Sequence, residues 1–122
     1  MAITHGTTIR NTLADDVGAA LANGNCVLKE GTTVICTIAL GATPFSAASG
    51  GTITLNGTPS GTASTSTTNG VDTFEMQDSG GALVYTGTVT VSGGGGDMEI
   101  SNTTIAANET VTITSHSYTA AP

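Results

Sequence analysis

Hydrophobic residues follow two different periods along this chain, and the period changes near residue 25. In the first segment, apolar side chains recur every four residues: Ile9, Leu13, Val17 and Leu21. This spacing predicts a short amphipathic helix whose apolar stripe packs on the rest of the domain. Thr7 or Thr8 can cap its start, and Asn23-Gly24 is a typical stop signal.

From residue 25 onwards, apolar and polar residues alternate with a period of two, which is typical of β-strands. Alternating segments occupy residues 25–30, 32–40, 51–57, 71–78, 81–93, 97–101 and 109–119, with a weaker eighth segment at 60–67. Seven to eight short strands at regular spacing predict a mainly β fold, either an antiparallel sandwich or a barrel. Within 32–40, the alternation places Val34 and Cys36 on one face and Ile35 on the other.

The length suits a single domain, residues 1–122, in which an N-terminal arm and helix (1–24) precede a β-sandwich (25–122). Segments 41–51 and 57–70 are rich in Gly, Pro, Ser and Thr, and we expect both to be exposed loops. A run of glycines, 93–96, lies between two alternating segments. The run is followed by an aspartate in place of the lysine of a phosphate-binding loop, so we expect a hairpin connection with positive φ angles.

Charge is scarce and mostly negative. Arg10 and Lys29 are the only basic side chains against nine carboxylates, for a formal net charge of −7. Binding to nucleic acid or to anionic membranes needs clustered Lys and Arg, so we expect neither as a partner. The sequence starts without a basic segment followed by an apolar run, and no apolar stretch reaches the roughly 20 residues that span a bilayer. We therefore expect synthesis and folding in the cytoplasm.

Hydroxyl side chains replace charged ones on the predicted solvent faces of the strands, which are rich in Thr. Thr suits a pleated surface because its branched side chain has a high β-propensity. Strands with so few charges pair readily at their edges. This favours coverage of some strands by a partner, or self-association.

Cys26 and Cys36 flank a predicted hairpin. In a cytosolic protein the simplest interpretation is two reduced, apolar thiols. A disulfide and a metal site are the alternatives, although no further His or Cys lies at a zinc-finger spacing. A three-residue loop at 29–31 would place both cysteines diagonally on one face, whereas a two-residue turn at 30–31 would place them on opposite faces and forbid a disulfide.

The acidic residues predict no catalytic pair. Asp72 and Asp78 share one face of their strand and Glu75 lies on the other, so these carboxylates do not converge from this segment. A solvated strand face is the simplest interpretation. A calcium site needs several oxygen ligands, which Asp78, Asp97 and Glu99 could help to supply only if the fold brought them together.

His5 and His116 are the only histidines, and a Ser-His-Asp arrangement would have to be assembled from distant segments. PFSAASGG (44–51) is not the Gly-x-Ser-x-Gly turn of hydrolases. His116 falls on the Thr-rich side of the last strand, and we expect an ordinary surface histidine. The chain has no Trp, and its aromatic residues are scattered: Phe45, Phe74, Tyr85 and Tyr118. The sequence therefore predicts no catalytic, cofactor-binding or metal-binding residue, and no enzyme.

Several long stretches of the chain carry a family resemblance. A Met-Ala-Ile-Thr start precedes TTIRNTLADDVGAAL (7–21) and GTTVICTIAL (31–40), and the chain closes on TTIAANETVTITSHSYTAA (103–121). The most specific stretch is 74–101, in which F-x-x-x-D-S-x-G precedes a strand, the glycine run and D-x-x-I-S. With these stretches the chain resembles, over about residues 2–120, small structural proteins encoded in the virion gene clusters of tailed bacteriophages.

This resemblance implies a virion component with a jelly-roll-like sandwich, foremost a head decoration (cement) protein that binds the outer surface of the capsid and stabilises it. Its partner would be the major capsid protein or another virion protein, with contacts made by residues 2–22 or by the Thr-rich strand faces. A tail-fibre or tail-tip module that binds host glycans is the alternative. A small hydrolase is a third hypothesis, which the missing site disfavours.

Overall fold

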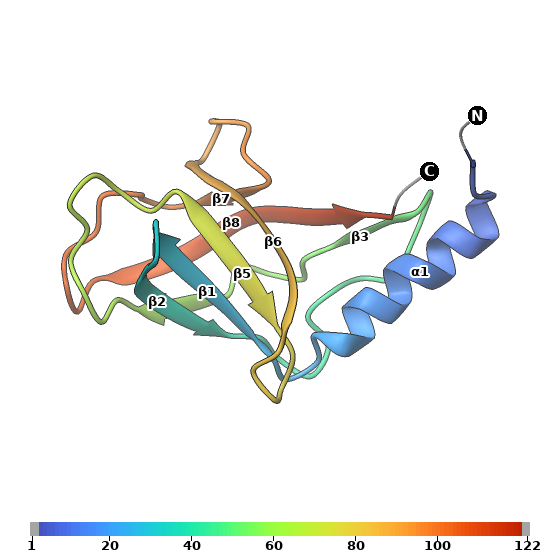
Figure 1. Cartoon of the computed structure of the whole chain (residues 1–122), viewed down its shortest axis with the longest axis horizontal. Coiled ribbons are helices and arrows are strands. Elements are labelled where there is room, and N and C mark those ends of the chain that lie inside the picture. The colour runs from blue at the N-terminus through green and yellow to red at the C-terminus, as the bar shows by residue number, and fades with distance from the viewer. Residues whose placement is uncertain (1–2, 121–122) are drawn as a thin grey trace.

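The computed structural model of the protein describes residues 3–120, which form one helix and eight strands (Figure 1). The helix is α1 (Thr7–Ala20). The strands are β1 (Asn25–Glu30), β2 (Thr33–Ala39), β3 (Thr52–Thr54), β4 (Ser60–Thr62), β5 (Thr73–Gln77), β6 (Leu83–Val91), β7 (Met98–Ile100) and β8 (Thr110–Thr119). The fold is mainly β, as the alternation predicts, and the weaker eighth segment contains β4. The ends of the predicted regions 1–24 and 25–122, residues 1, 2, 121 and 122, lie outside the described residues.

The strands form a sheet in the order β2-β1-β5-β6-β7-β8-β3, and β4 also pairs with β8. The pairs are antiparallel with one exception: β6 and β7 run parallel, with Val89 beside Met98 and Val91 beside Ile100. The sheet is therefore mixed, and the prediction of an antiparallel arrangement is wrong at this pair.

The glycine run accounts for the parallel pair. Residues 92–97 carry the chain from the end of β6 back to a point beside Val89. Strand β7 starts there and runs in the same direction as β6. Gly93 (φ 87°) and Gly95 (φ 82°) lie in the left-handed region, which other residues rarely adopt. Their amides donate to the two carboxylate oxygens of Glu99, both at 3.2 Å. The positive φ angles are confirmed, whereas the predicted hairpin is wrong.

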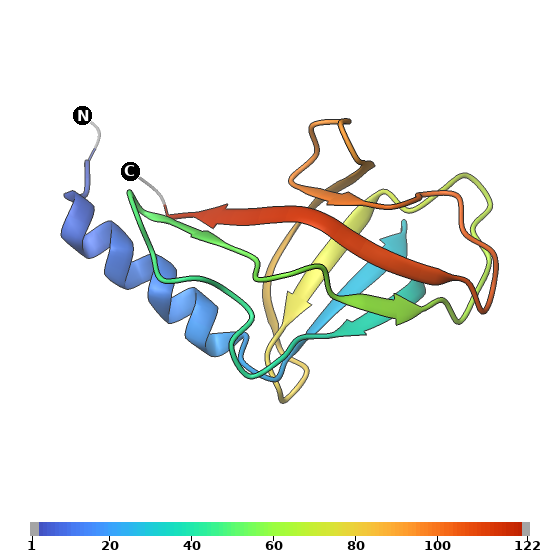
Figure 2. The same ribbon diagram turned by 180° about the vertical axis from the view of Figure 1, so that it is seen from behind.

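The sheet curls until β4 meets β2. In Figure 1 and Figure 2, β1, β2 and β5 form one layer, and β8 with β3 and β4 forms the other. Ala63, directly after β4, bridges to Cys36 of β2, and Ser64 N donates to the Ile35 carbonyl at 2.9 Å. The two layers therefore enclose one common core, with β4 closing one side.

A β-bulge in β2 changes which side chains face this core. The register with β1 shifts next to Leu28, so that Ile35 and Cys36 are both fully buried while Val34 is 43% exposed. The faces predicted for 32–40 are wrong for Val34 and Ile35, because one extra residue reverses the alternation. In the segments that contain β3, β5, β7 and β8, apolar residues that the alternation places on one face are buried: Ile53, Phe74, Met76, Met98, Ile100, Val111 and Ile113. In β6 the alternation fails, because Leu83 and Val91 are 57% and 47% exposed.

Helix α1 has nearly the predicted bounds but docks through a different side. Its N-cap is Gly6, where no side chain makes a capping hydrogen bond, so the predicted Thr cap is absent. Ala14 and Leu21 are fully buried, whereas Ile9 and Leu13 are 46% and 39% exposed. The apolar stripe of the sequence therefore packs only at its C-terminal end.

Polar side chains of α1 bind the loop before β3, which lies beside the helix in Figure 1. Gly51 N donates to Asn11 Oδ1 and Ala48 N donates to Asp15 Oδ1, both at 2.8 Å. These contacts use the side of the helix that carries positions 11 and 15. Leu13 lies between positions 11 and 15 in the sequence but on the opposite side of the helix. The N-terminal half of the apolar stripe therefore faces away from the sheet.

Candidate functional site

A second bulge brings His116 into the interior. Strand β7 pairs with β8 through Met98–His116 and Ile100–Ile113, and the register shift between them leaves one extra residue on β8. Ile113 and His116 therefore both point inward, and His116 is only 5% exposed. The prediction of a surface histidine is wrong. The alternation of residues along β8 could not predict that His116 is buried, because the bulge depends on how β8 pairs with β7.

Both ring nitrogens of His116 are hydrogen-bonded. Nδ1 lies 2.8 Å from the main-chain carbonyl oxygen of Asp97, and Nε2 lies 2.6 Å from the Tyr85 hydroxyl. A carbonyl only accepts, so Nδ1 carries the proton and Nε2 accepts the hydroxyl proton of Tyr85. Burial lowers the pKa of His116, and burial also raises the pKa of Tyr85. The pair is therefore neutral at pH 7, and neither nitrogen is free to take a proton from a substrate.

All four aromatic residues of the chain gather around this histidine. The ring centroids of Phe74 and Phe45 lie 5.1 and 6.0 Å from that of His116, both in edge-to-face geometry. The Tyr85 ring stacks on His116 at 5.8 Å and lies 5.0 Å from the Tyr118 ring. The prediction of scattered aromatic residues is wrong, because strands far apart in sequence meet here. Such pairs stabilise a core beyond the area that they bury.

All of these rings except that of Phe45 line a cleft between β6 and β8 and form its floor; the cleft has a volume of about 540 Å³. The lining residues are Phe74, Tyr85, Thr86, Gly96, Asp97, His116, Ser117, Tyr118 and Thr119. Strand β7 separates β6 from β8 and begins only at Met98, so on the other side of this residue no strand of the described part of the chain lies between them. In Figure 1 the two strands diverge on this side of β7. The cleft is thus a consequence of the short β7.

Asp97 closes one end of the cleft. Its Oδ2 accepts hydrogen bonds from the backbone N and the Oγ1 of Thr88, both at 3.0 Å. These two hydrogen bonds, the backbone one first, lower the pKa of the Asp97 carboxyl. Among the lining residues it is the one carboxylate, and the lining has no Lys or Arg. The cleft can hold a ligand, but Asp97 Oδ2 and both ring nitrogens of His116 already make hydrogen bonds within the protein, so neither residue is placed to transfer a proton.

The acidic residues near β5 do not converge, as the sequence predicts. Asp72 and Asp78 each accept hydrogen bonds from backbone amides of nearby turns, and Glu75 forms an ion pair with Lys29 at 3.0 Å. The carboxylates considered for calcium also accept hydrogen bonds from the protein: Asp78 from the turn before β6, Asp97 from Thr88, and Glu99 from the glycine run. Within residues 3–120, no group of three or more His, Cys, Asp or Glu side chains could hold a metal ion. His5 lies apart, in the exposed segment before α1.

Cys26 and Cys36 are free thiols and fully buried, as the simplest interpretation predicts. They lie diagonally on one face, because Cys26 pairs with Ile38 while Leu28 pairs with Cys36. The hairpin turn is 31–32, which is neither of the two predicted turns. Burial raises the pKa of Cys26 to about 12 and also raises that of Cys36. Neither thiol is poised to act as a nucleophile.

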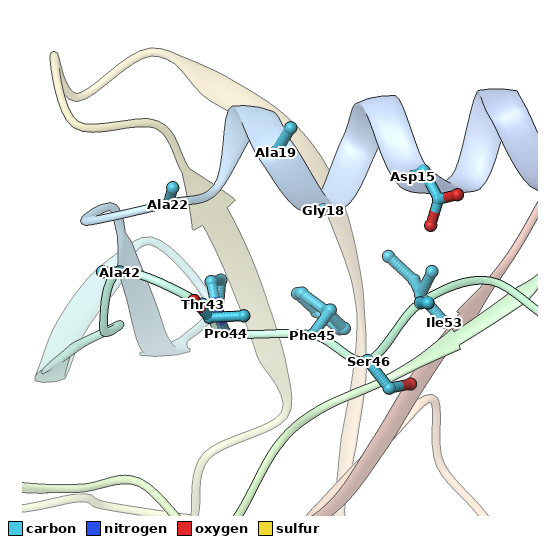
Figure 3. A pocket seen from close by; sticks show the side chains of 11 residues that line it. Asp15, Gly18, Ala19, Ala22, Ala42, Thr43, Pro44, Phe45, Ser46 and Ile53 are labelled. Atoms are coloured by element: carbon cyan, nitrogen blue, oxygen red, sulfur yellow. The ribbon is translucent and has the colours of Figure 1, made fainter.

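A second, smaller cavity of about 170 Å³ lies between α1 and the loop 42–47 (Figure 3). Small side chains and backbone line most of it. Asp15 is the one ionisable residue in its lining, and this carboxylate already accepts the hydrogen bond from Ala48. The cavity is therefore a packing gap under the helix and has no reactive group.

Comparisons of the chain with protein-family models, with curated proteins and with solved structures found no match. Within the described residues, no helix has the length and apolar character that crossing a membrane requires. The cleft and the exposed side of α1 are the two surface features described above that suit a ligand or a partner.

Proposed function

We propose that this protein is a non-enzymatic structural component of a bacteriophage virion, a head decoration (cement) protein that binds the outer surface of the capsid and stabilises it. Its partner is then the major capsid protein or another virion protein, and the chain is made in the host cytoplasm before it joins the particle. The proposal begins from the resemblance of residues 2–120 to small virion proteins.

The exposed apolar side of α1 is the observation that carries this proposal. Ile9 and Leu13 lie one turn apart and are 46% and 39% exposed, and Ile3 in the preceding segment is 84% exposed. Apolar side chains gathered on one surface indicate an interaction site. A specific interface buries about 1,000 Å² or more in total, so the contact would extend from α1 onto neighbouring Thr-rich strands.

The interior of the protein supports a role without catalysis. The buried His116 is neutral and has both nitrogens occupied, and the buried thiols have raised pKa values. We also propose that the fold is a jelly-roll-like sandwich, as the resemblance implies. The two layers around one core support this, and the parallel pair of β6 and β7 is a departure from it.

Reassembly on heads that lack the protein tests the proposal. We expect Leu13→Glu to weaken binding to heads by about tenfold or more, because an unpaired carboxylate buried in an interface costs over about 1.4 kcal/mol. Val34→Glu is the matched control, since Val34 on β2 is also an apolar residue that is 43% exposed. Equal weakening by the two substitutions contradicts a role for α1. Electron microscopy of particles should show density over the head, and density confined to the tail tip refutes the cement function.

A tail-fibre or tail-tip module that binds host glycans is the second candidate, and the aromatic cleft favours it. Tyr85 and Tyr118 bring two rings together at the cleft floor, and Thr86, Ser117 and Thr119 add hydroxyl groups to its walls. Ligand sites commonly combine aromatic surfaces with a few polar groups. Binding of neutral glycans that Tyr118→Ala abolishes, together with density at the tail tip, would replace the first proposal with this one.

A further inference from the structure

The cleft lies between two strand edges that have no strand between them. β6 pairs with β5 along most of its length, but it pairs with β7 only from Val89 onwards. β8 pairs with β7 only up to His116. On the far side of Met98 the chain has left the sheet through the glycine loop, so one strand position between β6 and β8 is empty within the described residues.

The backbone of β6 presents hydrogen-bonding groups to this empty position. Val89 N donates to the Asp72 carbonyl at 3.0 Å, so the peptide groups of odd-numbered residues face β5 in this part of the strand. The peptide groups of even-numbered residues face the other way. Thr88 N accordingly points toward β7 and donates to Asp97 Oδ2. The next such residue, Thr86, directs its N–H and carbonyl toward the cleft, where no strand of residues 3–120 pairs with this edge of β6.

The backbone of β8 presents a matching edge. Leu55 N donates to the His116 carbonyl at 2.9 Å, so the peptide groups of His116 and of every second residue beyond it face β3. Those of Ser117 and Thr119 then face the cleft. Within residues 3–120, β3 is the strand that pairs with this stretch of β8. Two strand edges with free peptide groups thus face each other across the same cavity, which is the arrangement that an added strand satisfies.

The occupant has to be extended and free of acidic side chains. The tyrosine rings of the floor suit an apolar side chain. The carboxylate of Asp97 repels acidic side chains, and the lining has no Lys or Arg that would attract them. A saccharide could contact the rings, but a peptide backbone repeats its donors and acceptors with the spacing of the two edges. An added strand would therefore form hydrogen bonds with the edges of β6 and β8 and also place a side chain on the aromatic rings of the floor.

We propose that the segment 3–6 of a second copy of this protein inserts into the cleft as an added strand, with Ile3 on the two tyrosine rings. This segment contains no acidic residue, and the first acid of the chain is Asp15. It is exposed, and Ile3 is the most exposed large apolar residue of the described part, at 84%. In both Figure 1 and Figure 2 it leads away from the sheet of its own molecule. A strand exchange of this kind joins copies into a chain or ring, whichever virion surface the protein occupies.

Cross-linking between two copies tests the proposal. A Thr4→Cys chain is mixed with an isotopically labelled Thr119→Cys chain under mild oxidation, and mixed disulfide dimers are counted by mass. We expect about tenfold or more of these dimers than with Thr32→Cys in place of Thr119→Cys, because docking raises the effective concentration of one thiol near the other. Thr32, in the β1–β2 turn, is also an exposed threonine. The native cysteines, which are fully buried, are the same in both mixtures.

Light scattering provides a second measurement with a separate variant. The wild-type protein should form species above 11.9 kDa as its concentration rises, and Ile3→Asp should remain at 11.9 kDa. Equal cross-linking of the Thr119→Cys and Thr32→Cys mixtures overturns the proposal. So does a Thr4→Cys/Thr119→Cys double variant that closes its disulfide within one monomer, because the segment would then fill its own cleft. Loss of head binding by Leu13→Glu, with cross-linking unchanged, would separate this inference from the cement function.

Discussion

The buried, neutral His116 should make the protein less stable as the pH falls below 6.5. Burial lowers the pKa of this imidazole in the folded protein from its ordinary value of 6.5. Between the lowered value and 6.5, the unfolded chain binds more protons than the folded one, so the free energy of unfolding rises with pH there. The stabilisation is fully present above pH 6.5 and is lost as the pH falls through this window.

The size of the effect follows from one proton. A single group changes the free energy of unfolding by at most about 1.4 kcal/mol per pH unit. For a domain of this size, this upper bound corresponds to a melting temperature lower by at most about 4 °C at pH 5.5 than at pH 6.5. The paired and capping carboxylates Glu30, Glu75 and Asp97 also have lowered pKa values, but their ordinary values of 3.8 to 4.5 place their contribution at lower pH.

Urea unfolding followed by circular dichroism at pH 7.5, 6.5, 5.5 and 5.0 measures this dependence. His116→Phe should abolish the slope between pH 6.5 and 5.0, whatever its effect on the absolute stability. His5→Gln, a change at the exposed histidine, should retain the slope of the wild type. If the wild type and His116→Phe lose stability in parallel, or if the wild type becomes more stable on acidification, the assignment of a neutral His116 is wrong.

Three further predictions concern other parts of the molecule. Glu30 accepts hydrogen bonds from the amides of residues 68–70, which lower its carboxyl pKa, so Glu30→Gln should speed hydrogen exchange of these amides with little change elsewhere. A Cβ at Gly94 would lie 2.6 Å from a threonine side chain of β6, so Gly94→Ala should destabilise the protein by about 1–3 kcal/mol in urea unfolding, whereas Gly41→Ala, in open space, should not. The thiol of Cys26, with its pKa raised to about 12, should react with a disulfide reagent at pH 8 only after denaturant is added, and rapid reaction in the native state would contradict its burial.

Local periodicity determined much of the fold. The helix, the segments that contain the strands and the inward residues of β5 and β7, such as Phe74 and Met98, follow from apolar spacing, because side chains on one face of a helix or strand must be buried together. The scarcity of Lys and Arg is likewise a property of the sequence alone.

Only the tertiary structure decided the candidate site. Each bulge adds one residue to a strand, which reverses the faces beyond it and places Ile35 and His116 inside. The N-terminal part of the apolar stripe of α1, Ile9 and Leu13, faces outward because backbone amides of the loop before β3 bind the polar side of the helix instead. The cleft arises because β7 is parallel to β6 and only three residues long, so it leaves the strand position beyond Met98 unfilled. Pairing partners, which periodicity in one strand does not specify, set all of these features.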